Sequence, residues 1–210
     1  MTFSGENLAC LRGERIVFQN LGFELDSGGM LLLLGANGSG KSTLLRLCAG
    51  FLRPFAGRLL YDGVGITGRM AEHRGRICYA GHLDALKAVF TVSENLLFWA
   101  RLSGGDENRL EEALDLFGLG PLADMPARFL SAGQRRRANL ARLAMSRAPL
   151  WLLDEPTTAL DQASCTRLFD LMERHRHAGG MIMAATHQKI ESAGSTVLSL
   201  DDFAPVEEVF

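Results

Sequence analysis

MLLLLGANGSGKST, residues 30–43, is the segment that decides the fold of this 210-residue chain. Met30 to Leu34 form a wholly apolar run of strand length. GANGSGKST follows and fits the pattern G-x-x-x-x-G-K-[ST], and Ser42 to Cys48 then have the pattern of a helix that ends at Gly50. A strand, a glycine-rich turn and a helix in this order predict a loop that binds the phosphates of a nucleoside triphosphate.

Each residue type in this loop has a physical reason. Glycines allow the backbone to curl so that successive N–H groups point at the phosphates, and the helix adds the positive end of its dipole. Lys41 is expected to contact the β- and γ-phosphates, and the Ser42 hydroxyl is expected to bind Mg²⁺. The predicted nucleotide-binding residues of the loop are Gly35, Ala36, Asn37, Gly38, Ser39, Gly40, Lys41, Ser42 and Thr43. By itself the loop leaves kinases, GTPases and transport ATPases open.

Two adjacent acids form a second candidate half of the site. Leu150 to Leu153 is a short apolar run, typical of a strand buried on both faces, and Asp154 and Glu155 follow it directly. An aspartate at the end of such a strand can reach Mg²⁺, and a glutamate one residue later can orient and deprotonate an attacking water. The alternative is a solvated turn, which the phosphate-binding loop upstream disfavours.

LSAGQ, residues 130–134, predicts a second helix start that can face an anion. Ser131 is a good N-cap, and Gly133 keeps the first turn free of a side chain, so the helix that runs to about Ser146 presents free N–H groups. An ordinary capped helix is the alternative for this motif taken alone.

The rest of the chain alternates apolar strands with amphipathic helices, which predicts the α/β class. Strands are expected at Ile16 to Phe18, Leu21 to Leu25, Leu59 to Tyr61, Ile77 to Tyr79, Met181 to Ala185 and Thr196 to Leu200, and helices at 93–118, with Ser93 as the N-cap, and at 162–178. His175 falls on the apolar face of the latter helix and His177 does not; neither has ligand spacing, and both are interpreted as structural.

Composition excludes several function classes. Lys and Arg total 22 and Asp and Glu total 24, so the net charge of −2 gives no basic excess for nucleic acid. Arg135, Arg136 and Arg137 point in three directions on a helix, so we expect a solvated face or a dimer rim. No stretch approaches the ~20 apolar residues of a membrane span. The cysteines at 10, 48, 78 and 165 form no C-x-x-C pair and are expected to be reduced thiols.

Together the motifs carry a resemblance. GANGSGKST, LSAGQ, LLDEP, Ala159-Leu160-Asp161 and Thr186-His187 match, in order and spacing, the motif set of the nucleotide-binding domain of ABC transporters. The resemblance implies a P-loop NTPase fold with a RecA-like core, an antiparallel β subdomain and a helical subdomain at about 82–130. It also implies that residues 1–210 form a single ABC ATPase domain.

The resemblance further implies a head-to-tail dimer of two copies of the chain, with ATP and Mg²⁺ as cofactors. Each ATP would lie between one copy's phosphate loop and the other copy's signature residues, which are Ser131, Ala132, Gly133 and Gln134. Asp161 would lie at the dimer seam, and Ser42 and Asp154 would hold Mg²⁺. Glu155 would be the general base, and His187 would hold the γ-phosphate.

The chain departs from the family pattern at three positions. Ala132 stands where glycine is commoner. Arg12 stands near where an aromatic residue usually stacks on adenine, although a guanidinium can stack as well. Ala80-Gly81-His82 replaces the usual glutamine, so His82 is predicted to contact Mg²⁺ or the attacking water, with a purely structural histidine as the alternative.

GHLDALKAVFTVSENLLFWARL, residues 81–102, resembles one subfamily, the haem-exporter ATPases of cytochrome c-type biogenesis. That resemblance implies a translocase ATPase bound to an integral membrane subunit of this system at the cytoplasmic face of the bacterial inner membrane. Its hydrolysis would serve haem export or the release of a haem-loaded chaperone. Apolar residues of the loop after His82 could dock that subunit or pack in the core; they are Leu83, Leu86, Val89 and Phe90.

Other functions share part of these motifs. The ATPase of another small ABC exporter and a P-loop small-molecule kinase stay open, although a kinase leaves LSAGQ and Thr186-His187 unexplained. Soluble ABC ATPases of DNA repair or translation have a long coiled-coil insertion or two tandem domains. Lys41 and Ser131 are only 90 positions apart, which disfavours both of those arrangements.

Overall fold

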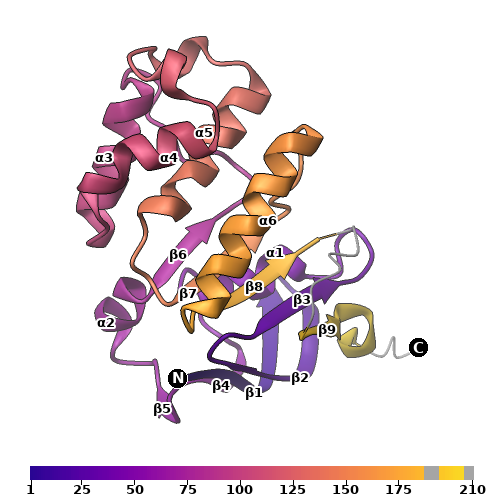
Figure 1. Ribbon diagram of the computed structural model, residues 1–210. Coiled ribbons are helices and arrows are strands. Elements are labelled where there is room, and N and C mark those ends of the chain that lie inside the picture. Colours follow the sequence, from indigo (N-terminus) through magenta and orange to yellow (C-terminus); the bar gives the residue numbers. More distant parts are fainter. Residues whose placement is uncertain (187–193, 206–210) are drawn as a thin grey trace.

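The computed structural model describes residues 1–186 and 194–205, which build two sheets and a group of helices (Figure 1). One sheet is antiparallel, in the order β2 (Arg15–Asp26), β1 (Thr2–Arg12), β4 (Ala56–Tyr61), β5 (Val64–Gly65). The other is parallel, in the order β6 (Ile77–Ala80), β7 (Leu150–Asp154), β8 (Met181–Ala185), β3 (Met30–Leu34), β9 (Ser195–Ser199). The predicted α/β class, with its parallel core and its antiparallel subdomain, is confirmed.

Helices cover both faces of the parallel sheet. They are α1 (Lys41–Cys48), α2 (Met70–Gly75), α3 (Val92–Ser103), α4 (Leu110–Leu116), α5 (Ala132–Met145) and α6 (Gln162–His177), with 3-10 turns at Glu107–Arg109, Gly120–Leu122, Ala127–Phe129 and Leu200–Phe203. Trp151 and Leu153 of β7 pack with α3, α5 and α6, whereas Leu150 and Leu152 pack with α1 and the antiparallel sheet. Strand β7 is therefore buried on both faces, as its apolar sequence predicts.

Between β6 and α5 every regular element is helical, which agrees with the helical stretch expected at about 82–130. Figure 1 shows α3 and α4 at the end of the molecule away from the antiparallel sheet. The assignment of residues 1–210 to a single ABC ATPase domain stays a prediction.

The helix predicted over 93–118 is wrong in its extent and in its cap. Thr91, not Ser93, is the N-cap, because Thr91 and Glu94 form a reciprocal capping box. The helix ends at Gly104, which has a left-handed φ of 68°, and α4 begins six residues later at Leu110. A side chain on Gly105 would also lie 2.6 Å from the carbonyl oxygen of Met145, so the chain has to turn there.

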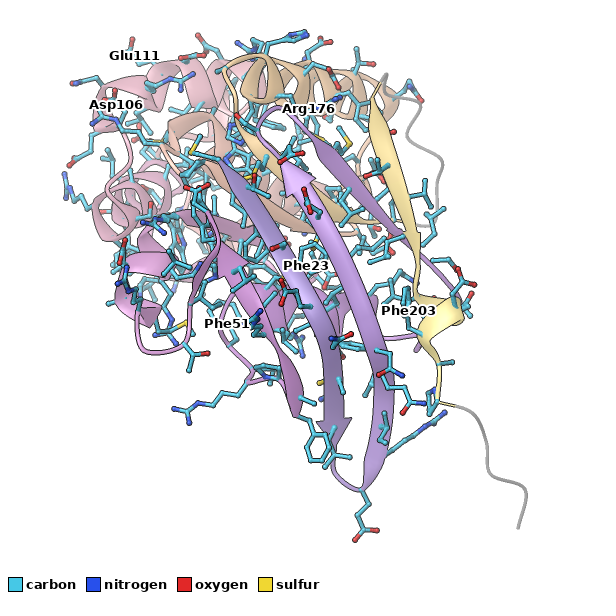
Figure 2. All side chains as sticks on the ribbon, turned by 90° about the horizontal axis from the view of Figure 1, so that it is seen from below. Phe23, Phe51, Asp106, Glu111, Arg176 and Phe203 are labelled. Carbon is cyan, nitrogen blue, oxygen red and sulfur yellow. The ribbon has the colours of Figure 1, made fainter. Side chains whose placement is uncertain are left out.

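The N-terminal strands are longer than expected. The two short strands predicted at 16–18 and 21–25 are one strand, β2. Strand β1 begins at Thr2, in a segment whose polar residues interrupt the alternation of apolar and polar positions that indicates a strand. β1 gains its stability from pairing with β2 on one edge and β4 on the other. Arg176 of α6 connects the helix layer to the turn between β2 and β3. Its Nε donates to the Gly28 carbonyl at 2.9 Å (Figure 2).

All four cysteines are free thiols, as expected. None of the helices in the described residues has both the length and the apolar character needed to cross a membrane.

His175 is half-buried in the helix layer, in the structural position that its sequence predicts. Its ring stacks on Trp151 of β7 with centroids 3.8 Å apart and an interplanar angle of 7°. Gly180 lies so close that a Cβ there would be 2.2 Å from the ring nitrogen Nε2. The pKa of His175 is lowered to about 4, because burial disfavours the charged imidazolium.

This histidine predicts a loss of stability in mild acid. Between pH 6.5 and about 4 the unfolded chain binds a proton at His175 that the folded chain excludes, so the free energy of unfolding falls as the pH falls. The expected contribution reaches roughly 3 kcal/mol at the lower limit, at about 1.36 kcal/mol per pKa unit. Above pH 6.5 the imidazole is neutral in both states and contributes no pH dependence.

The measurement is urea unfolding of the wild type and of His175→Phe at pH 7 and pH 5. Any packing penalty of the phenylalanine is the same at both pH values, so the difference between the two pH values isolates the titration. We expect the variant to lose less stability than the wild type between pH 7 and pH 5. Equal losses in both proteins would contradict the prediction.

Candidate functional site

The predicted phosphate-binding loop connects β3 to α1 at the carboxyl edge of the parallel sheet. Gly40 has a φ of +106°, and a Cβ there would lie 2.7 Å from Cγ1 of Val17, so only glycine fits. Gly40 is also the N-cap of α1 and has no side chain to occupy the helix start. The first N–H groups of α1 are thus left to an anionic ligand.

Lys41 is folded over the loop that precedes it. Its Nζ donates to the carbonyl oxygens of Gly35 and Ala36 at 2.7 and 3.0 Å, and its side chain is buried. The backbone N–H of Ala36 in turn donates to both carboxylate oxygens of Asp201, at 3.2 and 3.3 Å. Asp201 lies 165 positions along the chain from Ala36, and no sequence pattern signalled this contact.

Ser42 and Asp154 meet although they are 112 positions apart. The Ser42 hydroxyl donates to Oδ1 of Asp154 at 2.9 Å. Asp154 is only 1% exposed, and within the described residues its Oδ2 has no hydrogen-bond partner. A hydroxyl and a buried carboxylate with a spare acceptor are oxygen ligands that suit a hard divalent cation.

Glu155 follows Asp154 with an unusual backbone. Its φ is +49°, in the left-handed region that costs a non-glycine residue free energy, and its N–H donates to the Ala185 carbonyl at 2.9 Å. This turn directs the residue away from β7 and toward the phosphate loop. A cavity of about 500 Å³ is lined by Arg12, Val17, Asn37, Gly38, Gly40, Lys41, Ser42, Thr43, His82, Glu155 and Thr158.

That cavity brings together nine of the predicted site residues, whereas Gly35, Ala36, Ser39 and Asp154 do not line it. Arg12, His82 and Glu155 come from three distant segments and line it with the phosphate loop. His187 lies outside the described residues.

The four signature residues lie apart from this cavity, since none of them lines it. Ser131 and Gln134 are joined in a capping box, in which Gln134 Oε1 accepts from Ser131 N at 2.7 Å and Ser131 Oγ accepts from Gln134 N at 3.3 Å. Ala132 is exposed, and a Cβ on Gly133 would be 3.2 Å from the carbonyl oxygen of Ala159. Within one chain, the signature therefore contacts the loop that follows Glu155 but not the phosphate loop.

Asp161 is exposed and is the N-cap of α6, a role that sequence reasoning missed. Its Oδ1 accepts from the backbone N–H of Ser164 at 2.7 Å. This hydrogen bond holds the pKa of Asp161 below its ordinary value.

The expectation of a solvated face for the three consecutive arginines is wrong for Arg136. Its side chain is 4% exposed, and its guanidinium donates to the carbonyls of Gly81, Asp154 and Glu155. The carboxyl ends of β6 and β7 leave carbonyl groups without sheet partners, and the helix face that carries Arg136 covers them. The other two, Arg135 and Arg137, are half-buried, and each donates to one carbonyl, of Leu130 and Phe117 respectively.

The apolar residues of the loop after His82, for which docking and core packing were both open, divide between the two environments. Leu83 is 81% exposed and Val89 is 70% exposed, whereas Leu86 packs against the core and Phe90 is half-buried. The loop is held by Trp99, which donates to the Ala85 carbonyl at 2.6 Å, and by the buried Asn95. The two exposed apolar residues are free to meet a partner.

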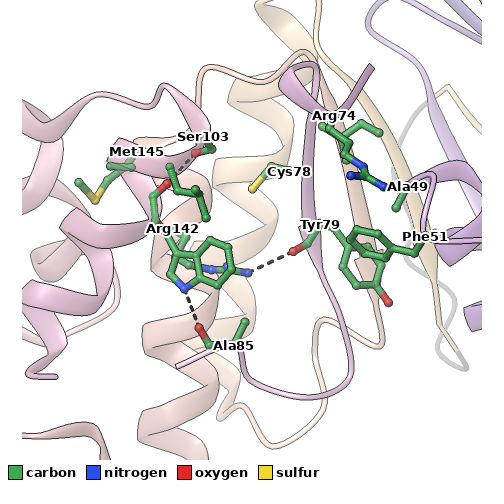
Figure 3. Close-up of a pocket in the computed structure, with 13 residues that line it drawn as sticks. Ala49, Phe51, Arg74, Cys78, Tyr79, Ala85, Ser103, Arg142 and Met145 are labelled. Carbon is green, nitrogen blue, oxygen red and sulfur yellow. Dashed lines mark hydrogen bonds between the residues drawn. The ribbon is translucent and has the colours of Figure 1, made fainter. Parts of the chain in front are cut away.

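A second cavity, of about 620 Å³ and mostly apolar, lies next to this loop, between β6, α3 and α5 (Figure 3). Figure 3 shows Arg142 reaching the Tyr79 carbonyl, a hydrogen bond of 3.1 Å, with Phe51 beyond Tyr79. The same guanidinium lies 4.6 Å from the centre of the Trp99 ring. Ala85 lines this cavity and His82 lines the first one, so a single short loop borders both.

Comparison with known proteins gives consistent results. The family described as ABC transporter matches residues 18–158. A protein of Rhodospirillum rubrum, named cytochrome c biogenesis ATP-binding export protein CcmA, is 59% identical over 97% of this chain and 87% of its own length. A protein of Paramagnetospirillum magneticum with the same name is 52% identical over 99% of this chain and 98% of its own length.

Solved structures share the fold. A putative ABC transporter ATP-binding protein from Pyrococcus furiosus has a TM-score of 0.85 at 22% identity and covers 98% of this chain and 100% of its own. A dimeric ATP-binding cassette, described as a post-hydrolysis state bound to ADP and Pi, has a TM-score of 0.78 at 24% identity and covers 89% of this chain and 88% of its own.

Proposed function

The chain belongs to the ABC transporter family, and from this premise we propose that it is the ATP-hydrolysing subunit of an exporter in cytochrome c biogenesis. One observation carries the catalytic part of the proposal: Lys41, Ser42, His82 and Glu155 line a single cavity at the carboxyl edge of the parallel sheet. The names of relatives that are 52 and 59% identical over nearly the whole chain support the assignment to export in cytochrome c biogenesis, and haem is the exported molecule that we propose.

The phosphates of ATP would be held by the N–H groups of the loop and of α1. Lys41 would exchange its two backbone carbonyls for phosphate oxygens, which are stronger partners for an ammonium group. Ser42 and Asp154 would hold Mg²⁺, an ion that neutralises charge on the phosphates when it is bound. Arg12 would lie beside the adenine, and Glu155 would accept the proton of the attacking water.

Two copies of the chain would complete two sites. Since the signature residues lie apart from their own chain's cavity, a head-to-tail dimer would bring Ser131 and Gly133 to the ATP of the other copy. The dimeric cassette of the same fold supports this arrangement. Asp161 would then lie at the seam, and His187 would hold the γ-phosphate.

The membrane partner would dock beside the loop that borders both cavities. Exposed Leu83 and Val89, together with the apolar cavity lined by Trp99, offer an apolar surface for a helix of an integral membrane subunit. Closure of the ATP site would move His82 and, through the same loop, the docked subunit. The chain would thereby act as a peripheral subunit at the cytoplasmic face of the bacterial inner membrane.

Two experiments test this function. Incubation with labelled ATP and Mg²⁺ should release free phosphate, whereas a phosphorylated small molecule would instead indicate a kinase. Recovery of the chain from detergent-solubilised membranes should bring with it a membrane subunit of cytochrome c biogenesis. Recovery with an unrelated permease would overturn the assignment to this exporter while leaving the ATPase intact.

His82 gives a prediction of its own. If it takes the place of the family's glutamine, His82→Gln should keep substantial ATPase activity, because an amide can still contact Mg²⁺ or the water. His82→Ala should lose up to about a hundredfold in turnover, because a misplacement of about 1 Å in a reacting group can cost that much. The measurement is steady-state phosphate release at saturating Mg²⁺ and ATP. Near-wild-type rates for both variants would return His82 to a structural role.

A further inference from the structure

Arg136 makes contacts that the motif set of the family does not account for. Its Nη1 donates to the carbonyl of Gly81 at 2.8 Å, and its Nη2 donates to the carbonyls of Asp154 at 2.9 Å and Glu155 at 2.6 Å. Asp84 supplies a counter-charge, with its Oδ1 3.5 Å from Nη1. A single guanidinium thus holds the backbone on both sides of the cavity, next to His82 and at Glu155.

The planar fork of an arginine suits this task. Its donors diverge in a fixed geometry, so the carbonyls at the ends of β6 and β7 are held at a fixed separation. Glu155 sits in a left-handed backbone conformation, with φ of +49°, that persists only when its surroundings impose it. The hydrogen bond from Arg136 to the carbonyl of this same residue helps to impose that conformation.

Arg136 also lies on the helix that begins at the signature residues. Arg136 follows Ser131 by five residues on α5, a rise of about 7.5 Å along a rigid helix. A second contact joins the same two regions, since Gly133 packs against the carbonyl of Ala159, in the loop that leaves Glu155. The signature is therefore connected to Glu155 by two routes, through α5 with Arg136 and through the contact of Gly133 with Ala159.

We propose that Arg136 is a positioning residue that fixes Glu155 and His82 relative to each other and links them to the signature of the same chain. The link has a consequence in the dimer, and this part rests on the proposed function. The signature of a chain faces one ATP while its Glu155 acts on the other, so Arg136 joins the two ATP sites within each chain. Filling one site would then align the catalytic glutamate of the second.

The first test compares Arg136→Gln with Arg147→Gln, a substitution of the same kind just beyond α5, where the exposed side chain forms an ion pair with Asp106. We expect Arg136→Gln to lower kcat by about 10- to 100-fold, as small misplacements of catalytic groups do, while the nucleotide Kd changes by less than about twofold. The Hill coefficient for ATP should fall toward one. Arg147→Gln should keep both kcat and the Hill coefficient.

Arg136→Lys distinguishes a specific loss of activity from a general loss of folded protein. Lysine keeps the charge but not the fork, so the thermal midpoint should recover while kcat recovers only in part. An unchanged kcat in Arg136→Gln, or a kcat loss matched by an equal loss of folded protein in both Arg136 variants, would overturn the proposal. An inactive wild type would instead overturn the proposed function, so the two failures are distinguishable.

Mixed dimers locate the effect. With Glu155→Gln in one copy, the remaining active site uses Glu155 of the intact copy and the signature of the substituted copy. Arg136→Gln placed in the intact copy should cause the larger loss of rate, and placed in the substituted copy a smaller one. Loss only from the substituted copy would refute the assignment to Glu155, and no loss from that copy would refute the link to the signature.

Discussion

Glu155→Gln is expected to lower ATP turnover by about 100-fold or more while ATP still binds, because an amide of the same size cannot accept the proton of the attacking water. Glutamine fits the same volume, and the N–H of residue 155 can still donate to the Ala185 carbonyl. The substitution therefore leaves the phosphate loop and the cavity intact. ATP should then hold two copies together, because the step that reopens the dimer is blocked.

The measurement combines steady-state phosphate release with size-exclusion chromatography in the presence of Mg²⁺ and ATP. Glu111→Gln is the matched control, since it makes the same chemical change on the exposed face of α4 and should leave turnover at the wild-type rate. Full turnover in Glu155→Gln would show that another group is the general base. A variant that neither binds ATP nor dimerises would also contradict the assignment.

The second large effect is expected at Lys41. Lys41→Met keeps the buried aliphatic stem but removes the ammonium group, which donates to Gly35 and Ala36 in the structure and would donate to phosphates in the complex. Charge-assisted hydrogen bonds contribute about 1.5–3 kcal/mol each, so nucleotide affinity should fall by about 100-fold or more.

A fluorescent ATP analogue titrated into each protein gives the two dissociation constants. Lys87→Met is a suitable control, because Lys87 lies over the ring of Phe98 and does not line the ATP cavity. We expect Lys87→Met to bind the analogue with wild-type affinity. Retention of tight binding in Lys41→Met would show that the loop backbone alone holds the phosphates.

Much of the fold is predictable because its signals are local. The run Leu150–Asp154 is apolar at four consecutive positions, which few environments other than a two-faced buried strand accept. The helix start at Ser131 is equally local, since its capping partner Gln134 is three residues away. The cap at Thr91 was available by the same rule, because Glu94 follows it by three residues, whereas Leu96 follows Ser93.

Other features depend on contacts between distant segments. Arg135, Arg136 and Arg137 have the same local sequence character, and only the carbonyls at the ends of β6 and β7 distinguish the buried one. The contact of Asp201 with the phosphate loop has the same origin, because β9 pairs with β3 and the segment that follows β9 contains Asp201. Periodicity describes one segment at a time and contains no information about such partners.

The candidate site also contains residues that local sequence predicts and residues whose positions depend on distant contacts. The phosphate loop and the acids at 154 and 155 are defined by spacing, and the structure places them in contact through Ser42 and Asp154. The position of His82 in the cavity depends on how its loop is held by Asn95 and Trp99, which spacing does not describe.

Two backbone carbonyl oxygens take the place of phosphate oxygens as hydrogen-bond partners of Lys41. The ammonium group that would bind the phosphates of ATP donates to two carbonyl groups of the chain itself, which compensate part of the cost of its burial. Nucleotide affinity is then a difference between two sets of partners for one cation, and it is lower than the phosphate contacts alone would give. The carbonyl groups of Gly35 and Ala36 compete with phosphate oxygens for Lys41. This competition favours the release of ADP, which has to leave the subunit in every catalytic cycle.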